Sequence, residues 1–103
     1  MSKYGNVKTD GYDSKREAIR ASELKLLERA GKITDLESQR EFILISKSDF
    51  GQAIKYRSDF CYRTDGIFTV EDVKSPITAK NPVYRLKRRL MQEVYGITIR
   101  EVA

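Results

Sequence analysis

The stretch from Asp59 to Lys74, DFCYRTDGIFTVEDVK, decides how the middle of this chain folds. Two runs of alternating side chains flank the pair Asp65-Gly66, which is typical of the type I′ turn of a β-hairpin. A two-residue turn fixes which residues face each other across the two strands. The predicted opposed pairs are Thr64 with Ile67, Tyr62 with Thr69, Phe60 with Glu71, and Asp59 with Asp72.

This register places the carboxylates of Asp59 and Asp72 side by side on one face of the hairpin. Like charges directly opposite each other destabilise a sheet, so something should offset their repulsion. A shared proton, a nearby cation and a bound metal ion are the candidates. Lys74 follows Asp72 on the same face and can supply the cation. Two solvated surface acids, one of them paired with Lys74, are the other interpretation that the residues leave open.

The chain reads as one α/β (α+β) domain, residues 14–103, after an N-terminal arm, residues 1–13, since no linker or repeat divides it. The expected order after the arm is a helix, several strands, a helix and a final strand. The expected ranges are helices over 14–30 and 82–95, extended segments over 33–36, 42–45, 54–63 and 67–74, a loop over 75–81, and a last strand over 97–102.

Local signals mark the ends of both predicted helices. Ser14 begins a capping box, and Gly31 ends the first helix. Asn81-Pro82 begins the second helix, and Gly96 ends it. The apolar spacing predicts buried stripes, formed in the first helix by Ala21, Leu24 and Leu27 and in the second by Val83, Leu86, Leu90 and Val94.

Composition restricts the chemistry that this chain can perform. The sequence has no histidine, which excludes a Ser-His-Asp triad, Cys-His catalysis and His-bearing zinc sites. Its single cysteine, Cys61, excludes an internal disulfide and suits a reducing cytoplasm. No apolar segment is long enough to cross a bilayer. We therefore expect a cytoplasmic protein whose chemistry uses carboxylates, lysine, tyrosine or hydroxyls.

The pattern of Asp59 followed on the partner strand by Asp72-Val73-Lys74 resembles the signature of the PD-(D/E)XK nuclease superfamily. The chain is similar in particular to small phage-encoded endonucleases and proteins that resolve Holliday junctions. The resemblance implies a restriction-endonuclease-like core, a mixed sheet with a β-meander flanked by two helices in the order α-β-β-β-α-β. It also implies a Mg²⁺ or Mn²⁺ site held by Glu17, Asp59, Asp72 and the Val73 carbonyl, with Lys74 as the catalytic lysine.

One position departs from the motif, and three others leave alternatives within this resemblance. Ser58 stands where the motif often has proline. Glu71 directly precedes Asp72, and a local twist would exchange their roles. Glu17 also suits helix capping without any part in metal binding. Gln39 is expected either to line the site or to hydrogen-bond across the sheet.

A net charge of +5 favours a polyanionic partner, and the second helix carries much of the positive charge. Contacts with phosphates rather than bases are expected from Arg85, Lys87, Arg88 and Arg89. Further contacts with DNA are expected from Lys80, from Lys3 and Lys8 in the arm, and from Tyr84, which could stack on a base. Arg85 and Arg89 lie four residues apart and share one helix face. The alternatives are that Tyr84 packs on the sheet and that the basic face is simply solvated.

The sequence thus predicts a Mg²⁺-dependent DNA endonuclease, phage or mobile-element encoded, that acts on branched DNA or nicks duplex DNA. A chain of 103 residues offers little surface for DNA, so a homodimer is expected. The alternative is a non-catalytic nucleic-acid-binding or accessory module that retains the nuclease core. A purely structural or protein-binding domain is a third interpretation.

Overall fold

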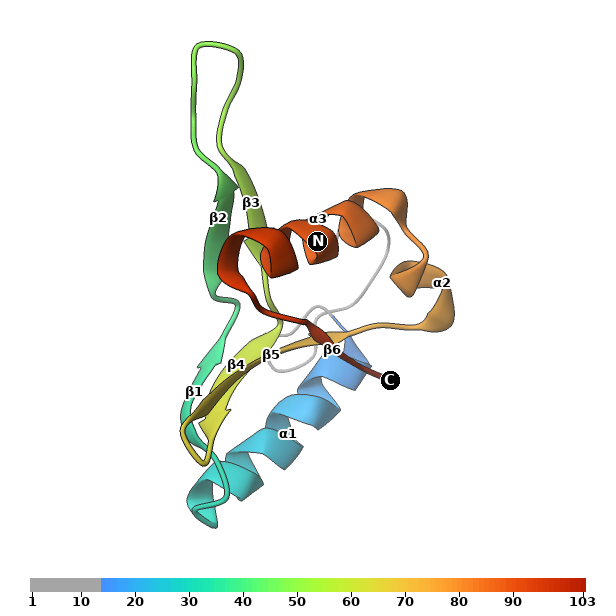
Figure 1. The fold of residues 1–103 in the computed structure, drawn as a ribbon. Coiled ribbons are helices and arrows are strands. Elements are labelled where there is room, and N and C mark those ends of the chain that lie inside the picture. The colour runs from blue at the N-terminus through green and yellow to red at the C-terminus, as the bar shows by residue number, and fades with distance from the viewer. Residues whose placement is uncertain (1–13) are drawn as a thin grey trace.

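The fold is a four-stranded mixed sheet between two long helices, with a separate two-stranded hairpin extending from it (Figure 1). The computed structural model describes residues 14–103, so the arm expected over 1–13 lies outside the described residues. The helices are α1 (Lys15–Arg29), α2 (Pro76–Ala79) and α3 (Pro82–Tyr95). The strands are β1 (Thr34–Ser38), β2 (Glu41–Ile45), β3 (Ile54–Arg57), β4 (Phe60–Thr64), β5 (Ile67–Val73) and β6 (Arg100–Val102).

Strands β1, β4 and β5 form an antiparallel meander, and β6 lies parallel to β5 on its other side. Strands β2 and β3 pair with each other and are inserted between the first two strands of the meander. The α+β class that the sequence predicts is confirmed. Helix α1, the meander, α3 and β6 follow one another in the expected order α-β-β-β-α-β, with the β2–β3 hairpin as an addition.

The β4–β5 hairpin has the register that the sequence predicts. Asp65 and Gly66 have φ values of 51° and 81°, the left-handed conformation that both central positions of a type I′ turn require. Phe60 pairs with Glu71 across the two strands. Because successive side chains point to opposite faces of a sheet, Glu71 and Asp72 lie on different sides of β5.

Both long helices begin and end at the predicted signals. The Ser14 hydroxyl accepts a hydrogen bond from the Glu17 amide at 3.1 Å. Asn81 Oδ1 accepts from the first two free amides of α3 at 2.9 and 3.1 Å. Gly31 and Gly96 adopt positive φ values of 77° and 67° just beyond the helix ends, where a side chain would strain the backbone.

The extended run expected over 54–63 is interrupted, because the chain bends at Ser58 and Asp59 and passes from one sheet to the other. Ser58 is buried, and its amide and hydroxyl both donate to the Arg40 carbonyl, at 3.0 and 3.1 Å. This partner lies between β1 and β2, so nothing within residues 54–63 reveals it. The bend places Asp59 just before β4 instead of within a strand.

The other differences from the expected ranges are local. The loop expected over 75–81 contains one helical turn, α2, because the side chains of Ser75 and Thr78 cap each other's backbone amides and Pro76 stands at the first turn. The strand expected over 33–36 runs over Thr34–Ser38 instead, and the last strand is limited to Arg100–Val102.

Helix α3 buries a different face from the one that its apolar spacing predicts. The residues of the predicted stripe that are at least half exposed are Val83 (62%), Leu86 (57%) and Val94 (50%). The buried residues of α3 are Tyr84 and Met91, and Leu90 lies at the edge of the core. The Tyr84 hydroxyl donates to Glu101 on β6 at 2.7 Å, and this polar contact turns the Tyr84 side of the helix toward the sheet.

Helix α1 covers the opposite face of the sheet. Ala21 and Leu24 pack there against Ile33, Phe60 and Tyr62. Leu27, which the apolar spacing places on the buried stripe, is 37% exposed because the last turn of α1 contacts solvent.

The core on the α3 side contains the single cysteine. Its buried members are Phe42, Leu44, Tyr56, Cys61, Val70, Tyr84, Met91 and Ile99. The Cys61 side chain is fully buried, and its Sγ lies 3.5 Å from a carboxylate oxygen of Glu37. Burial raises the pKa of the Cys61 thiol to about 11.

A buried ion pair fixes α1 to the central strand. Glu71 on β5 is fully buried, and its two carboxylate oxygens accept hydrogen bonds from Arg20 Nε at 2.8 Å and from an Arg20 terminal nitrogen at 2.7 Å. The Tyr62 hydroxyl donates to the same carboxylate. Burial opposes ionisation of Glu71, but the hydrogen bonds from Arg20 and Tyr62 outweigh it and lower the pKa of Glu71.

We predict that Arg20→Ala destabilises the fold by about 3–5 kcal/mol, because it leaves the Glu71 carboxylate buried without its cation. Chemical denaturation measures this loss, and Arg16→Ala, an exposed change in the same helix, should stay within about 0.5 kcal/mol of the parent protein. The double variant Arg20→Met, Glu71→Leu should recover most of the stability. An Arg20→Ala protein as stable as the parent would contradict a structural role for the pair.

Candidate active site

The candidate site lies where the bend at Asp59 meets the end of β5. The Asp59 carboxylate accepts a hydrogen bond from the Val73 amide at 2.7 Å, and it lines the same cleft as the Asp72 carboxyl. The Asp59 amide donates to the Glu71 carbonyl at 3.2 Å. These contacts hold the Asp59 side chain against β5 near Asp72. The predicted Asp59–Asp72 pair is not part of the β4–β5 ladder, which ends at Phe60 and Glu71, because Asp59 lies in the bend.

Asp72 is the most enclosed acid of this site. It is 3% exposed, and its Oδ2 accepts a hydrogen bond from the Tyr56 hydroxyl at 2.5 Å. Lys74 Nζ lies 3.1 Å from the other carboxylate oxygen. Burial, followed by the charge of Asp72, raises the pKa of the Tyr56 hydroxyl, which therefore stays a donor. Strand β3 thus supplies a group to the site that the sequence analysis missed.

The pKa of the Asp59 carboxyl is raised well above the usual range of an aspartate. Burial is the largest cause that raises the pKa of Asp59, the hydrogen bond and charge of Asp72 follow, and the result is about 9. The Val73 amide acts in the opposite direction, and the charge of Glu17 adds a smaller upward contribution. Of the three candidates for offsetting the repulsion, the structure contains a cation, at Lys74, and the raised pKa of Asp59 favours a proton on that carboxyl.

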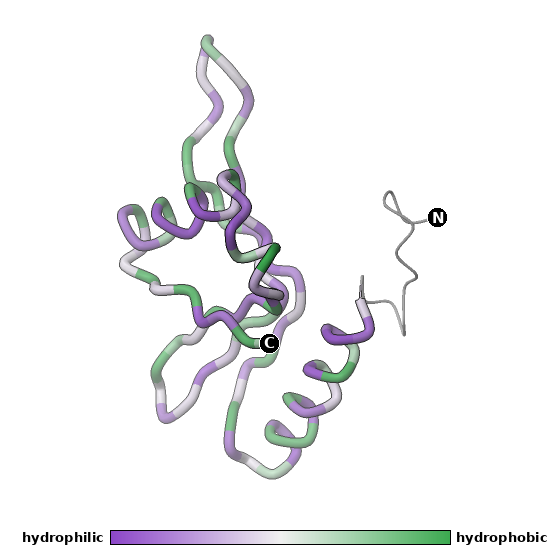
Figure 2. The backbone as a smooth tube through the Cα atoms, turned by 90° about the vertical axis from the view of Figure 1, so that its right-hand side faces the viewer, coloured by the Kyte–Doolittle hydropathy of each residue, from purple (hydrophilic) through white to green (hydrophobic). Residues whose placement is uncertain are grey.

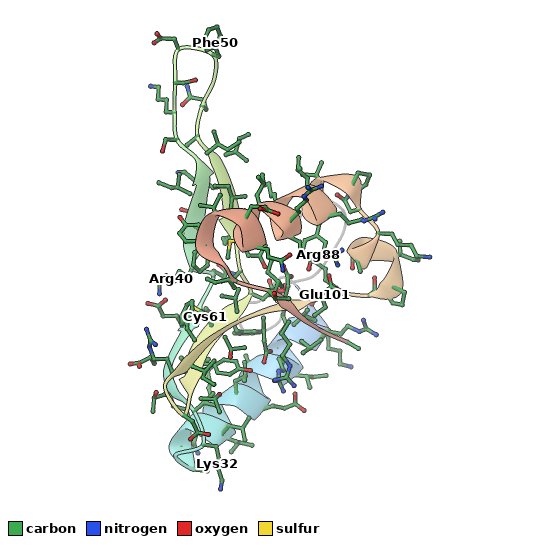
Figure 3. The ribbon with its side chains drawn as sticks, viewed as in Figure 1. Lys32, Arg40, Phe50, Cys61, Arg88 and Glu101 are labelled. Carbon is green, nitrogen blue, oxygen red and sulfur yellow. The ribbon has the colours of Figure 1, made fainter. Side chains whose placement is uncertain are left out.

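The Lys74 ammonium is fixed from its second side by an aromatic ring. Its Nζ lies 4.4 Å from the centre of the Tyr84 ring, a cation–π contact. The Tyr84 hydroxyl donates to Glu101, which also accepts from Arg88 at 2.7 Å (Figure 3). Glu101 on β6 pairs with Asp72 on β5 in the parallel ladder. The contacts that run from Asp72 through Lys74, Tyr84 and Glu101 therefore form a closed network that begins and ends at β5.

These side chains line an open cleft of about 330 Å³. Its lining residues are Tyr56, Arg57, Asp59, Asp72, Lys74, Asn81, Val83, Tyr84 and Lys87. Arg57 and Lys87 add two cations that make no ion pair with another side chain of residues 14–103. An open cleft with two acids and three cations can accept a phosphate group beside the carboxylates.

The structure places the remaining predicted site residues differently. Glu71 faces α1 and is bound to Arg20, so Asp72 is the acid that shares a face with Asp59. Among residues 14–103 no three acidic, cysteine or histidine side chains are placed to hold a metal together, so the expected three-acid cluster is not assembled. Glu17 lies on the helix that covers the other face of the sheet, and its charge acts on Asp59 from there.

Gln39 contributes its backbone to the site. Its amide donates to the Asp59 carbonyl at 3.0 Å, and its φ of 57° lies in the left-handed region. This backbone contact crosses from the end of β1 to the bend, and a role for the Gln39 side chain stays a prediction. The Val73 amide binds Asp59, while a role for the Val73 carbonyl as a metal ligand stays a prediction.

The residues predicted to contact DNA fall into three places. Lys87 lines the cleft, and Lys80 lies beside it in a hollow that also contains Lys74. Arg85, Arg88 and Arg89 line a groove of about 500 Å³ on the other flank of α3. Tyr84 is 7% exposed and its ring packs against Lys74. This position agrees with the alternative in which Tyr84 is packed in the protein. The remaining pair, Lys3 and Lys8, lies outside the described residues.

Comparison with known proteins identifies the family of this chain. It belongs to the family described as "Protein of unknown function (DUF1064)", whose model matches residues 1–101. No curated protein and no solved structure matches the chain. Within residues 14–103, no helix has the length and apolar character to cross a membrane.

We predict that the proton held by Asp59 stabilises the folded state and that this contribution to the free energy of unfolding falls as the pH rises. The folded state holds the Asp59 proton up to a pKa of about 9, whereas the unfolded chain releases it near 4, so the contribution is complete below pH 4 and is lost on the way to pH 9. Asp59→Asn should flatten this decline and be more stable than the parent protein at pH 8. Thermal denaturation from pH 5 to pH 9 measures both curves.

The matched control for this prediction is Asp65→Asn, which makes the same chemical change at the turn of the same hairpin, where asparagine also suits the backbone. Its curve should follow that of the parent protein. Below pH 4 all three proteins should lose stability together, because the depressed pKa values of Glu71 and Glu101 favour folding only when those groups are ionised. Parallel curves for Asp59→Asn and the parent protein from pH 5 to 9 would contradict the raised pKa of Asp59.

Proposed function

We propose that this protein is a metal-dependent DNA endonuclease. The observation that carries the proposal is the convergence of Asp59, Asp72 and Lys74 in one open cleft, which is the arrangement that the resemblance to PD-(D/E)XK nucleases implies. Two carboxylates and an ammonium group beside a space for a phosphate suit hydrolysis of a phosphodiester. The order of α1, the meander, α3 and β6 agrees with the core of that superfamily.

The carboxylate pair fits a Mg²⁺ or Mn²⁺ ion. Magnesium needs only one or two protein carboxylates, with water and substrate phosphate completing its shell, so Asp59 and Asp72 are sufficient donors. The raised pKa of Asp59 supports a site where a dication can replace the proton of that carboxyl. The Val73 carbonyl is a further donor in this proposal, whereas Glu17, which is not assembled with the two aspartates, is not required. When bound, the ion polarises the phosphate and lowers the pKa of a coordinated water.

The protein's own groups orient the substrate and stabilise charge. Lys74, held between Asp72 and the Tyr84 ring, places its ammonium at the cleft wall, where it can donate to a phosphate oxygen as negative charge develops. Arg57 and Lys87 bind phosphates that enter the cleft. The groove formed by Arg85, Arg88 and Arg89 binds the DNA backbone beyond it. We further propose branched DNA as the substrate, a homodimer as the acting form and the cytoplasm as its location.

We predict that the parent protein cuts DNA in the presence of Mg²⁺ or Mn²⁺ and that Asp59→Asn, Asp72→Asn or Lys74→Ala lowers the rate at least about 100-fold. The assay uses linear, supercoiled and four-way-junction DNA, with gel analysis of nicks and breaks. Asp65→Asn, which changes an acid of the same hairpin outside the cleft, should cut like the parent protein.

Retained metal-dependent cutting by a clean preparation of Asp72→Asn would contradict the assigned site. A parent protein that binds DNA with steep salt dependence and leaves it intact would establish the alternative, a binding or accessory module. A protein without DNA affinity at physiological salt would exclude both functions.

We predict that Mg²⁺ raises the melting temperature of the parent protein at pH 8, because the folded state binds the ion and the unfolded state does not. Asp72→Asn should lose most of this increase. Calorimetric titration in buffers of different ionisation enthalpy should also detect proton release on binding, since the ion displaces the proton that Asp59 holds. No stabilisation at roughly 10 mM Mg²⁺ would contradict the metal site independently of any cleavage assay.

A further inference from the structure

The β2–β3 hairpin, residues 41–57, projects from the body of the molecule and ends at Phe50 (Figures 1 and 3). Its base is anchored, because Phe42 and Tyr56 are buried against α3 and the Tyr95 hydroxyl donates to the Ile43 carbonyl at 2.6 Å. The outer part extends beyond these contacts, away from the rest of the described chain. The hairpin is therefore a fixed support that carries its tip away from the cleft.

The tip of this hairpin is a turn that is closed by hydrogen bonds. The Ser48 amide donates to the Gly51 carbonyl at 3.0 Å, and the Gly51 amide donates back to the Ser48 carbonyl at 3.3 Å. The Phe50 amide donates to the Ser48 hydroxyl at 3.2 Å. Despite this local order the Phe50 side chain is 100% exposed. The turn thus holds a large aromatic ring entirely in water, a placement that costs hydrophobic free energy unless something covers the ring.

Hydrophobic residues occupy the base of the hairpin and recur at its tip, with polar residues between them (Figure 2). Ile43 and Ile45 alternate with buried neighbours on β2 and are 50% and 48% exposed, and Ile54, opposite Ile45, is 41% exposed. A strand that is apolar on both faces is typical of one that is covered on both. In this structure only the inner face is covered by the described residues.

The charges on the hairpin favour a polyanion as the covering partner. Arg57 lines the cleft, Lys55 follows on the same face of β3, and Lys47 lies near the tip. With the two acids Glu41 and Asp49, the segment over residues 41–57 has a net charge of +1. Arg57 and Lys55 therefore carry positive charge from the candidate active site along β3 toward the tip.

We propose that the β2–β3 hairpin binds DNA and that the Phe50 ring stacks on a base where the regular base stack is interrupted. Aromatic rings at nucleic-acid interfaces stack on unpaired bases or enter between base steps, and both need a base face that an intact duplex conceals. The inference rests on the proposed function and names its substrate class, DNA with a branch, bulge or unpaired end.

The hairpin also sets the position of that interruption. The chain from Phe50 to Arg57 spans at most about 25 Å, which corresponds to roughly seven base steps of about 3.4 Å along one strand. The cut should therefore lie within about that distance of the branch.

Phe50→Trp tests the stacking directly, because the chain has no tryptophan and the new indole is the only one present. The variant is combined with Asp59→Asn so that the DNA stays intact. Titration with a four-way junction should quench the indole emission and protect it from acrylamide, whereas a linear duplex of the same composition should do so much less. The matched control is Ile67→Trp, at a position 69% exposed at the far end of the β4–β5 hairpin, whose emission should not change.

A second measurement uses Phe50→Ala in the same Asp59→Asn background. Its affinity for the junction should fall about 10-fold, while its affinity for the linear duplex should change less than about twofold. Equal loss for both DNAs, or junction binding that leaves the indole emission of the Phe50→Trp variant unchanged, would overturn the stacking proposal. An emission change that follows protein concentration without DNA would also overturn it and indicate a second copy as the partner.

Failure of this inference and failure of the proposed function give different results. Cleavage by the Phe50→Ala protein with the parent Asp59, at the parent rate and with the parent preference for junctions, would remove the hairpin proposal and leave the nuclease intact. A parent protein that never cuts DNA, but whose Phe50→Trp variant is quenched by junctions, would remove the nuclease and leave the hairpin as a DNA-binding element.

Discussion

The ion pair between Glu71 and Arg20 is the interaction on which the arrangement of this molecule depends. It joins α1 to the strand that also carries Asp72 and leads into Lys74, and it lies one residue before the site. Because the pleat sends neighbouring side chains to opposite faces, one acid stabilises the fold and the next is left for the cleft. A shift of β5 by one residue would exchange these roles and bury the wrong carboxylate.

The side chains of the site are held in fixed positions, and its two acids lie close enough to repel each other. Asp59 is positioned by backbone contacts to Val73 and Gln39, and Asp72 by the Tyr56 hydroxyl and Lys74. The cleft therefore has a defined shape before any ligand arrives, yet its acids stay close enough to repel each other. Such preorganised groups with perturbed pKa values are typical of functional sites.

The sequence was most informative where structure is determined locally. The Asp65-Gly66 turn fixed the register of its hairpin, and residues beside each helix end predicted the boundaries of α1 and α3. It failed where the deciding partner is distant along the chain. The Arg40 carbonyl causes the bend at Ser58, and Glu101 selects which face of α3 is buried. The same distance explains why Tyr56 could not be assigned to the site: only the packing of a second sheet brings it to Asp72.

The burial of Cys61 has a practical consequence for studying this protein. A thiol with no exposed surface and a pKa of about 11 has almost no reactive thiolate at neutral pH. Maleimide reagents should therefore ignore it in the folded state, and a cysteine introduced on the surface can be labelled selectively in the otherwise native chain. Attachment of a dye or spin label requires no prior removal of the natural cysteine, whose replacement would disturb the centre of the sheet.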